Sequence, residues 1–227
     1  MDDIGLRMNN KEKWYGDAAT YWQKVDPSID GMLQGFEHVS PVDVKGSSNF
    51  IKKLKNEKIL TTDCHRAADF GAGIGRVTKL CLLKHFKVVD IIEQCENFTN
   101  NIVKYMNDDS LASRIENIFT IGAQSFIPSA GHYDLIWMQW FVGHFTDDDF
   151  VAVLQNCKRG LREGGCIVIK DNVASKEPVL DEDDSSVTRT HDQFLKIFSD
   201  AGLELRQEAD QKGLPSTLFT VKMYALT

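Results

Sequence analysis

Cysteine pairs, metal-ligand spacings and long apolar runs are all missing from this sequence, and each absence argues against a class of protein. The five cysteines show no C-x-x-C spacing, and their odd number predicts reduced thiols in a protein of the cytosol, the nucleus or both. No spacing of His, Cys and Asp matches a ligand set, so no metal is expected. Apolar runs stay far below the roughly 20 residues that span a bilayer, which predicts no membrane partner.

Excess positive charge is also absent. The net charge is −7, which argues against a nucleic-acid backbone as partner and is compatible with a basic ligand. The polar opening MDDIGLRMNNKEKWYGD predicts no secretory signal. These observations favour an acidic protein of the cytoplasm or nucleus that acts on something other than nucleic acid.

The apolar content is high enough to build a substantial core. Hydrophobic residues make up 42% of the 227 positions, and this length fits one α/β domain with additions. Residues 1–12 are expected to form a loose tail, followed by a single domain over 13–227. Within that domain, residues 13–60 read as an N-terminal extension of short helices.

Strand and helix patterns alternate through the middle of the chain, which predicts a doubly wound parallel sheet. Gly202 is the expected stop signal of the last helix, and Thr190 and Gln193 have capping-box spacing at its start. Trp137 is expected in the core, and Trp140 past the end of its strand. The expected strands are 66–70, 87–92, 117–122, 132–140, 166–172, 203–210 and 218–226, and the expected helices are 17–24, 49–60, 77–85, 98–106, 147–161 and 190–201.

The stretch DFGAGIGR follows the first expected strand and is the strongest local motif. In an open α/β sheet, ligands bind at the carboxyl ends of the strands, and glycine at the first turn lets the backbone approach them. Gly71, Gly73 and Gly75 give G-x-G-x-G, whereas the dinucleotide fingerprint is G-x-G-x-x-G and would need glycine at Arg76. A nicotinamide-dependent oxidoreductase is therefore disfavoured, and a tight turn without a ligand stays the plain alternative.

Asp69 before the glycines, together with Glu93 at the end of the second strand, resembles the class I S-adenosylmethionine-dependent methyltransferases. The resemblance implies a Rossmann-like fold with a seven-stranded, mostly parallel sheet and helices on both faces. It implies S-adenosylmethionine as cofactor and S-adenosylhomocysteine as product. Glu93 would accept hydrogen bonds from both ribose hydroxyls, and Arg76 would pair with the methionine carboxylate.

Four further stretches make the resemblance specific: YWQKVDPSIDGMLQG at 21–35, LIWMQWFVGHF at 135–145, IKDN at 169–172 and LDEDDSSV at 180–187. With DFGAGIGR they are similar to the eukaryotic protein N-terminal (α-amino) methyltransferases, in the same order and from Trp14 to the C-terminus. That family methylates the free amine of protein tails that begin X-Pro-Lys or X-Pro-Arg after removal of the initiator Met. Ribosomal proteins are among the implied targets, and a monomer is favoured.

The family resemblance assigns roles to individual positions. Two of them depart from its pattern: Glu93 replaces an Asp that relatives can carry, and Phe219 replaces a Tyr near the substrate, so a hydroxyl is lost. The implied cofactor residues are Gly71, Gly73, Arg76, Glu93, Gln94, Cys95, Ala123, Gln124 and Gln139, with Trp22 and Met32 closing over the cofactor from the extension. The implied substrate residues are Trp140, Asn172, Asp181, Asp184, Ser186, Phe219, and Leu33 and Val39 as walls of a proline pocket.

Methyl transfer to an amine requires a free lone pair on nitrogen. A free α-amine has a pKa of about 7.7–8.0, so a modest base and good positioning are sufficient. Asp184 and His144 are both candidates for accepting the proton, and Asn172 can orient the amine. Asp181 and Asp184 can pair with a Lys or Arg at the third substrate position, while Trp140 offers a flat wall for the proline.

Other functions are weighed by the same residues. Methyltransferases of bases or glutamine often carry Asn-Pro-Pro-Tyr after the fourth strand, where this chain reads MQWFVGH. An inactive scaffold would be expected to lose the glycines, Glu93 or the acidic loop, and all are present. A small molecule remains a possible methyl acceptor, and the number of methyl groups transferred is open. His144 could instead have a structural role, and the acidic loop at 181–184 could simply be solvated.

Overall fold

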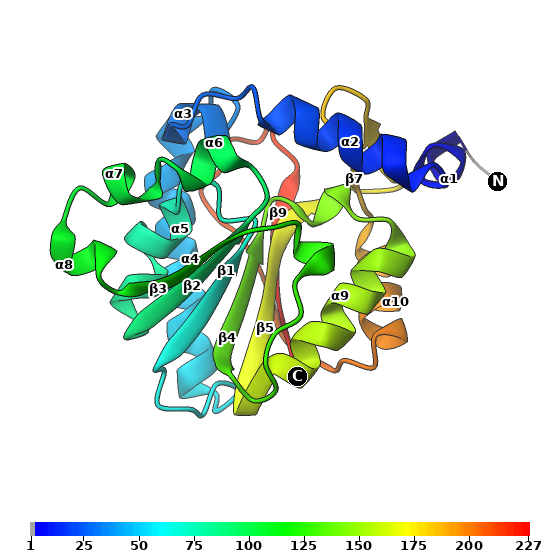
Figure 1. The fold of residues 1–227 in the computed structure, drawn as a ribbon. Coiled ribbons are helices and arrows are strands. Elements are labelled where there is room, and N and C mark those ends of the chain that lie inside the picture. Colours follow the sequence, from blue (N-terminus) through cyan, green and yellow to red (C-terminus); the bar gives the residue numbers. More distant parts are fainter. Residues whose placement is uncertain (1–2) are drawn as a thin grey trace.

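A seven-stranded sheet forms the centre of the computed structural model, which describes residues 3–227 (Figure 1). Its strand order is β3-β2-β1-β4-β5-β9-β8, with the first five strands parallel and β9 antiparallel to both of its neighbours. This confirms the predicted seven-stranded, mostly parallel sheet. The strands are β1 Arg66–Phe70, β2 Val88–Glu93, β3 Ile115–Thr120, β4 Tyr133–Gln139, β5 Leu161–Val173, β8 Leu205–Asp210 and β9 Thr220–Leu226, and a separate hairpin pairs β6 Val179–Asp181 with β7 Ser186–Thr188.

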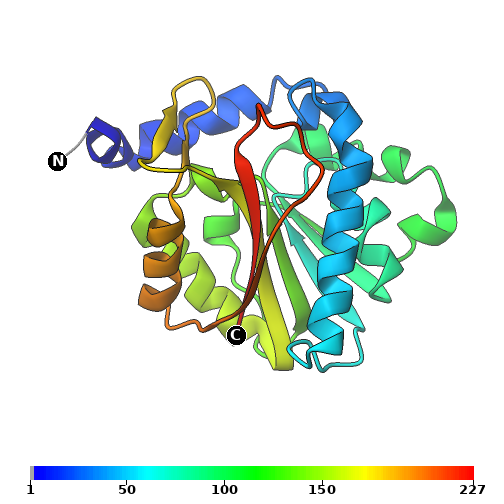
Figure 2. The ribbon, with the colours of Figure 1, turned by 180° about the vertical axis from the view of Figure 1, so that it is seen from behind.

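Helices cover both faces of the sheet because its parallel strands are apolar on both sides. On one face α9 and α10 pack on Ile136 and Met138 of β4, while on the other α4 packs on Leu135 and Trp137 (Figures 1 and 2). Trp137 is thus in the core, as expected. The helices are α1 Asp3–Met8, α2 Lys11–Trp22, α3 Ile29–Met32, α4 Ser40–Asn56, α5 Arg76–Leu80, α6 Glu96–Thr99, α7 Ile102–Met106, α8 Asp109–Ala112, α9 Asp147–Gly160 and α10 His191–Asp200.

The first helices of the N-terminal extension, α2 and α3, lie across the end of the sheet where the parallel strands finish, and α4 then runs along one face (Figures 1 and 2). The loose tail expected over residues 1–12 differs from the structure, in which α1 begins at Asp3 and α2 at Lys11; Met1 and Asp2 lie outside the described residues. The Asn10 side chain caps α2, and Lys11 forms a 2.7 Å ion pair with Asp149 of α9. The Asn10 cap is a local signal that the sequence analysis overlooked, whereas the partner of Lys11 lies 138 residues away along the chain.

Two of the expected helices have different bounds in the structure. The helix expected over 49–60 is the second half of α4, which starts earlier, at Ser40, with Pro41 in its first turn. The helix expected over 98–106 is divided into α6 and α7. Within residues 3–227 no helix is both long and apolar enough to cross a membrane.

The capping box of α10 provides a test of the fold. The Gln193 amide donates to the Thr190 hydroxyl at 3.3 Å, and the Thr190 amide donates to the Gln193 side chain at 2.9 Å. We expect Thr190→Ala to lower the free energy of unfolding by about 1 kcal/mol, measured by urea denaturation. Thr217→Ala, at an exposed loop position, should stay within about 0.5 kcal/mol of the wild type. Equal losses in the two variants would contradict the capping role.

Candidate active site

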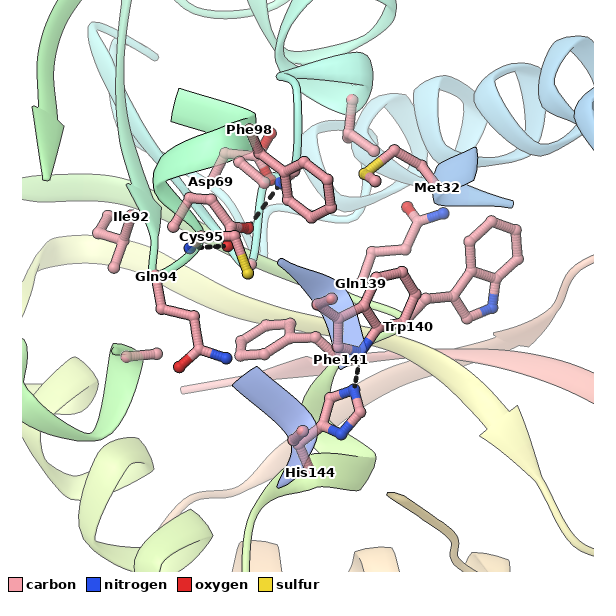
Figure 3. Close-up of a pocket in the computed structure, with 18 of the residues that line it drawn as sticks. Met32, Asp69, Ile92, Gln94, Cys95, Phe98, Gln139, Trp140, Phe141 and His144 are labelled. Carbon is pink, nitrogen blue, oxygen red and sulfur yellow. Dashed lines mark hydrogen bonds between the residues drawn. The ribbon is translucent and has the colours of Figure 1, made fainter. Parts of the chain in front are cut away.

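Two adjoining cavities lie at the carboxyl ends of the parallel strands, beneath the N-terminal extension. The first cavity is bounded by the β1–α5 turn, the end of β2 and the end of β4 (Figure 3). Every residue expected to hold the cofactor lies on its wall, although those positions are scattered from 22 to 139. They are Trp22, Met32, Gly71, Gly73, Arg76, Glu93, Gln94, Cys95, Ala123, Gln124 and Gln139.

The glycine turn between β1 and α5 requires glycine for two reasons. Gly71, Gly73 and Gly75 have φ values of +62°, +57° and +83°, which other residues rarely adopt. In addition, a Cβ on Gly71 would lie 2.4 Å from the Phe141 ring, and one on Gly73 would lie 2.4 Å from the Met32 sulfur. The turn therefore packs directly against two side chains of the cavity wall.

Glu93 joins the glycine turn to the end of β2. Its two carboxylate oxygens accept from the backbone amides of Gly73 and Cys95, each at 2.8 Å. Burial raises the pKa of Glu93, and these backbone donors oppose the increase. Each oxygen keeps a second lone pair, so the carboxylate can still accept hydrogen bonds from a bound diol.

Asp69, at the end of β1, is a second buried acid on the same wall. Burial raises its pKa to about 7, while the Thr78 hydroxyl donates to it at 2.6 Å and favours the ionised form. The first cavity therefore contains two carboxyl groups, a basic guanidinium on Arg76 and a largely apolar floor. This combination suits a ligand that carries hydroxyls and both signs of charge.

The second cavity begins where the first ends and opens toward the β6–β7 hairpin. Its walls come from the extension, the turn after β4, the end of β5, the hairpin and the segment before β9. All residues expected to bind substrate lie on these walls. They are Leu33, Val39, Trp140, Asn172, Asp181, Asp184, Ser186 and Phe219.

The two cavities adjoin each other, and six residues line both of them; we call these six residues the shared wall. Trp140 follows the last residue of β4, with φ +56° and its amide donating to the Lys170 carbonyl at 3.0 Å. Figure 3 shows its ring near Gln139 and Phe141, beside the first cavity. A molecule in one cavity can therefore meet a molecule in the other at this wall. Its residues, which line both cavities, are Trp22, Met32, Leu33, Trp140, Phe141 and His144.

His144 is held by hydrogen bonds at both ring nitrogens. The Trp22 indole donates to Nε2 at 3.0 Å, the hydrogen bond drawn to His144 in Figure 3. Nδ1 lies 3.0 Å from the Ser185 carbonyl. An indole N–H can only donate and a carbonyl can only accept, so the imidazole is neutral with its proton on Nδ1. The lone pair that would accept a proton is already used. His144 thus links α2, the turn after β4 and the hairpin.

Asp184 has a different environment. Only 7% of it is exposed, and its Oδ1 has no hydrogen-bond partner among the described residues. Burial raises the pKa of Asp184, and the Ser186 hydroxyl opposes this. A buried acceptor without a partner at the wall of a cavity can take a proton or a hydrogen bond from a ligand.

Asp171 is a wall residue of the second cavity that the sequence analysis missed. It is 8% exposed, its Oδ1 accepts from the Asn172 amide at 2.7 Å, and its Oδ2 has no partner among residues 3–227. Burial raises the pKa of Asp171 to about 7. Its position at the carboxyl end of β5, beside the expected Asn172, was the available signal. No group of three or more His, Cys, Asp or Glu side chains within the described chain could hold a metal ion.

The raised pKa of Asp171 predicts a pH-dependent stability effect. The folded chain holds this proton more tightly than the unfolded chain, whose Asp pKa is about 3.9. This contribution is present below about pH 4 and is lost as the pH rises through 7. We expect Asp171→Asn to raise Tm relative to the wild type more at pH 8 than at pH 5. Asp148→Asn, at an exposed site, is the control, and a Tm difference for Asp171→Asn that does not change with pH would refute the assignment.

Comparisons with known proteins identify the family of this chain. The chain matches the model of the AdoMet-dependent proline di-methyltransferases over residues 10–227. It is 42% identical over 222 residues to Alpha N-terminal protein methyltransferase 1 of Arabidopsis thaliana, covering 96% of this chain and 80% of that one. It is 41% identical over 219 residues to N-terminal Xaa-Pro-Lys N-methyltransferase 1 of Mus musculus, covering 96% of this chain and 97% of that one.

A solved structure of a SAM-dependent methyltransferase from Leishmania major has the same fold. It superposes with a TM-score of 0.86 at 33% sequence identity, covering 100% of this chain and 87% of that one. The match to the family model spans nearly the whole chain, and the relatives span most of it. This protein therefore belongs to the family of AdoMet-dependent proline di-methyltransferases.

Proposed function

We propose that this protein transfers methyl groups from S-adenosylmethionine to the free α-amino group of protein chains that begin X-Pro-Lys or X-Pro-Arg. The observation that carries the proposal is the shared wall, because it lets a ligand of the first cavity meet a ligand of the second. The acidic hairpin at the far side of the second cavity supports a basic side chain in the acceptor. The names of the relatives, N-terminal Xaa-Pro-Lys N-methyltransferase 1 among them, support the same reaction.

The first cavity fits S-adenosylmethionine, which supplies an activated methyl group on a sulfonium. Glu93 is assigned to the ribose hydroxyls, because its oxygens retain lone pairs on a buried carboxylate. Arg76 is assigned to the carboxylate of the methionine part, because guanidinium and carboxylate pair well when buried. The glycine turn brings backbone within contact distance, and Trp22 and Met32 cover the cavity from the extension.

The second cavity fits the first three residues of a protein tail. Trp140, Leu33 and Val39 offer apolar surface to the proline, whose fixed φ lowers the entropy lost on binding. Asn172 can donate to a carbonyl and accept from the terminal amine. Asp181 on the hairpin is assigned to the Lys or Arg at the third position. Phe219 is 43% exposed and can contribute apolar contact there, without the hydroxyl that a tyrosine would add.

Asp184 is the better-placed of the two proposed proton acceptors. The Nε2 lone pair of His144 is occupied by the Trp22 indole, whereas Oδ1 of Asp184 is unpartnered. With an amine pKa of about 7.7–8.0, a neutral fraction already exists at pH 7, so the base is needed only for a small part of the barrier. Positioning in the shared wall contributes more, up to about 7–11 kcal/mol in favourable cases.

The choice of acceptor atom is tested with two peptides that differ only at the amine. One begins Ser-Pro-Lys with a free α-amine, and the other carries the same sequence with an acetylated amine and a free lysine side chain. After incubation with the protein and S-adenosylmethionine, mass spectrometry should detect methyl groups on the first peptide alone. Methylation of both would indicate a lysine side-chain enzyme, and methylation of neither would reject this class of acceptor.

The assignment of the base is tested by substitution. We expect Asp184→Asn to lower kcat by about 10²–10⁴-fold, since general-base catalysis contributes about that much. His144→Asn keeps a side-chain donor toward Ser185 and should lower kcat by less than Asp184→Asn does. Asp183→Asn, exposed in the same hairpin, should leave kcat nearly unchanged. A larger loss in the His144 variant than in the Asp184 variant would reverse the assignment.

A further inference from the structure

A buried ionic cluster lies beneath the first cavity and connects the N-terminal extension to the sheet. Its centre is Asp43 of α4, which is fully buried. The Asp43 carboxylate lies 2.5 Å from the Lys170 ammonium of β5 and accepts from Arg76 at 2.8 Å. It also accepts from the Gln139 amide at 3.0 Å. Side chains from β4, β5 and α5 thus converge on one carboxylate of α4, which runs along the sheet (Figure 2).

Lys170 is satisfied entirely within this cluster and does not line the cavity. It is fully buried, and beyond the Asp43 carboxylate its ammonium donates to the Asp43 carbonyl, Ser47 and Gln211 at 3.0, 2.9 and 2.8 Å. Burial alone lowers the pKa of Lys170, and the Asp43 carboxylate opposes this. Lys170 therefore acts as a fixed positive charge that holds Asp43 from the side away from the cavity.

Arg76 and Gln139 are the members of the cluster that reach the cavity. The hydrogen bonds of Arg76 within residues 3–227 come from Nη1, to Asp43 and Ser40, and leave Nη2 and Nε free to donate. The Arg76 guanidinium also lies 5.5 Å from the centre of the Trp140 ring in the shared wall. Its free donors can therefore serve a ligand, while Nη1 is fixed.

The charges of the cluster do not cancel. Asp43 carries one negative charge, and Lys170 and Arg76 carry two positive charges, which leaves an excess of one positive charge. Burial would raise the pKa of Asp43, but Lys170 and Arg76 lower it below its usual value, so the carboxylate stays ionised. Asp69, an acid of the cavity wall whose carboxylate also feels the charge of Arg76, is hydrogen-bonded to Thr78 and not to the cluster. The uncompensated charge is thus on Arg76, at the side where a ligand binds.

We propose that Asp43, held in place by Lys170, is a positioning residue that aims Arg76 and Gln139 at the carboxylate of the cofactor's amino-acid part. The N-terminal extension then does more than cover the cofactor, because its α4 helix sets the geometry of the carboxylate subsite. The inference rests on S-adenosylmethionine as cofactor and is independent of the methyl acceptor. A ligand carboxylate would bring the buried charge to zero, which gives it a selective advantage over a ligand that lacks this group.

The test compares two ligands that differ only by that carboxylate: S-adenosylhomocysteine and its decarboxylated analogue. Their Kd values are measured by isothermal titration calorimetry on the full chain, without any acceptor. The wild type should bind S-adenosylhomocysteine more than about tenfold more tightly than it binds the decarboxylated analogue. This comparison does not depend on any variant folding, and equal affinity for the two ligands would overturn the proposal.

Variants then assign the preference to the cluster. Asp43→Asn keeps both positive charges but removes the acceptor that holds Arg76 and Gln139, so charge alone would increase the ratio of the two Kd values. Positioning by Asp43 predicts the opposite: a ratio reduced by about tenfold or more, mainly through weaker binding of S-adenosylhomocysteine. Lys170→Met removes the excess charge and should reduce the ratio in the same direction, which provides an answer if Asp43→Asn does not fold. Asp90→Asn is the matched control, because Asp90 is a buried carboxylate that pairs with Arg66 at 3.0 Å away from the cavity.

The outcomes separate positioning from general stability. If Asp43 only stabilised the fold, the Asp43 variant would bind both ligands more weakly by the same factor. That result would overturn the proposal. An unchanged ratio in both the Asp43 and Lys170 variants would also overturn it. Since no acceptor is present, failure here leaves the X-Pro-Lys assignment intact, and failure of the peptide test leaves this result intact.

Discussion

The carboxyl edge of a parallel sheet must be covered without being filled, and this constraint governs the whole structure. The strands β1, β2, β4 and β5 all end there, and each contributes polar groups to the site. The segment before α4 covers this edge, and specific contacts fasten the extension there, chiefly Asp43 at the start of α4 with Arg76 and Trp22 with His144. The space that remains is divided into two cavities with one common wall. A two-substrate reaction follows naturally from this arrangement.

Hydrogen bonds made by the extension and the hairpin also determine which polar side chains remain available to a ligand. His144 resembles a base by residue type, yet its hydrogen bonds to Trp22 and Ser185 make it a connector between three segments. Asp184 lies on the same cavity with an unpartnered oxygen, and so combines access with an unsatisfied acceptor. Residue type alone left these two equivalent. The hydrogen-bond partners, which depend on the extension and the hairpin, distinguish them.

Local sequence determines much of the sheet and of the helices α9 and α10 that cover one face, and less of the N-terminal extension. The bounds of β1 and the capping box of α10 followed from short patterns, because apolar strands and caps are local signals. The motifs also identified positions that all line the two cavities. Asp43 and Lys170 were not found, since each would look like a solvated charge until the other is brought beside it from 127 residues away. The start of α2 was missed although Asn10 provides a local cap, and its contacts to Asp149 come from a distant helix.

The central claim is that the acceptor amine meets the cofactor at the shared wall. It is tested most directly by a crystal structure of the protein with S-adenosylhomocysteine and a peptide that begins Ser-Pro-Lys. The account predicts the peptide's terminal nitrogen beside Trp140, facing the cofactor sulfur, with Asn172 and Asp184 within hydrogen-bond distance of the first residue. A terminal nitrogen bound outside the second cavity, or a lysine side chain at the shared wall in its place, would contradict it.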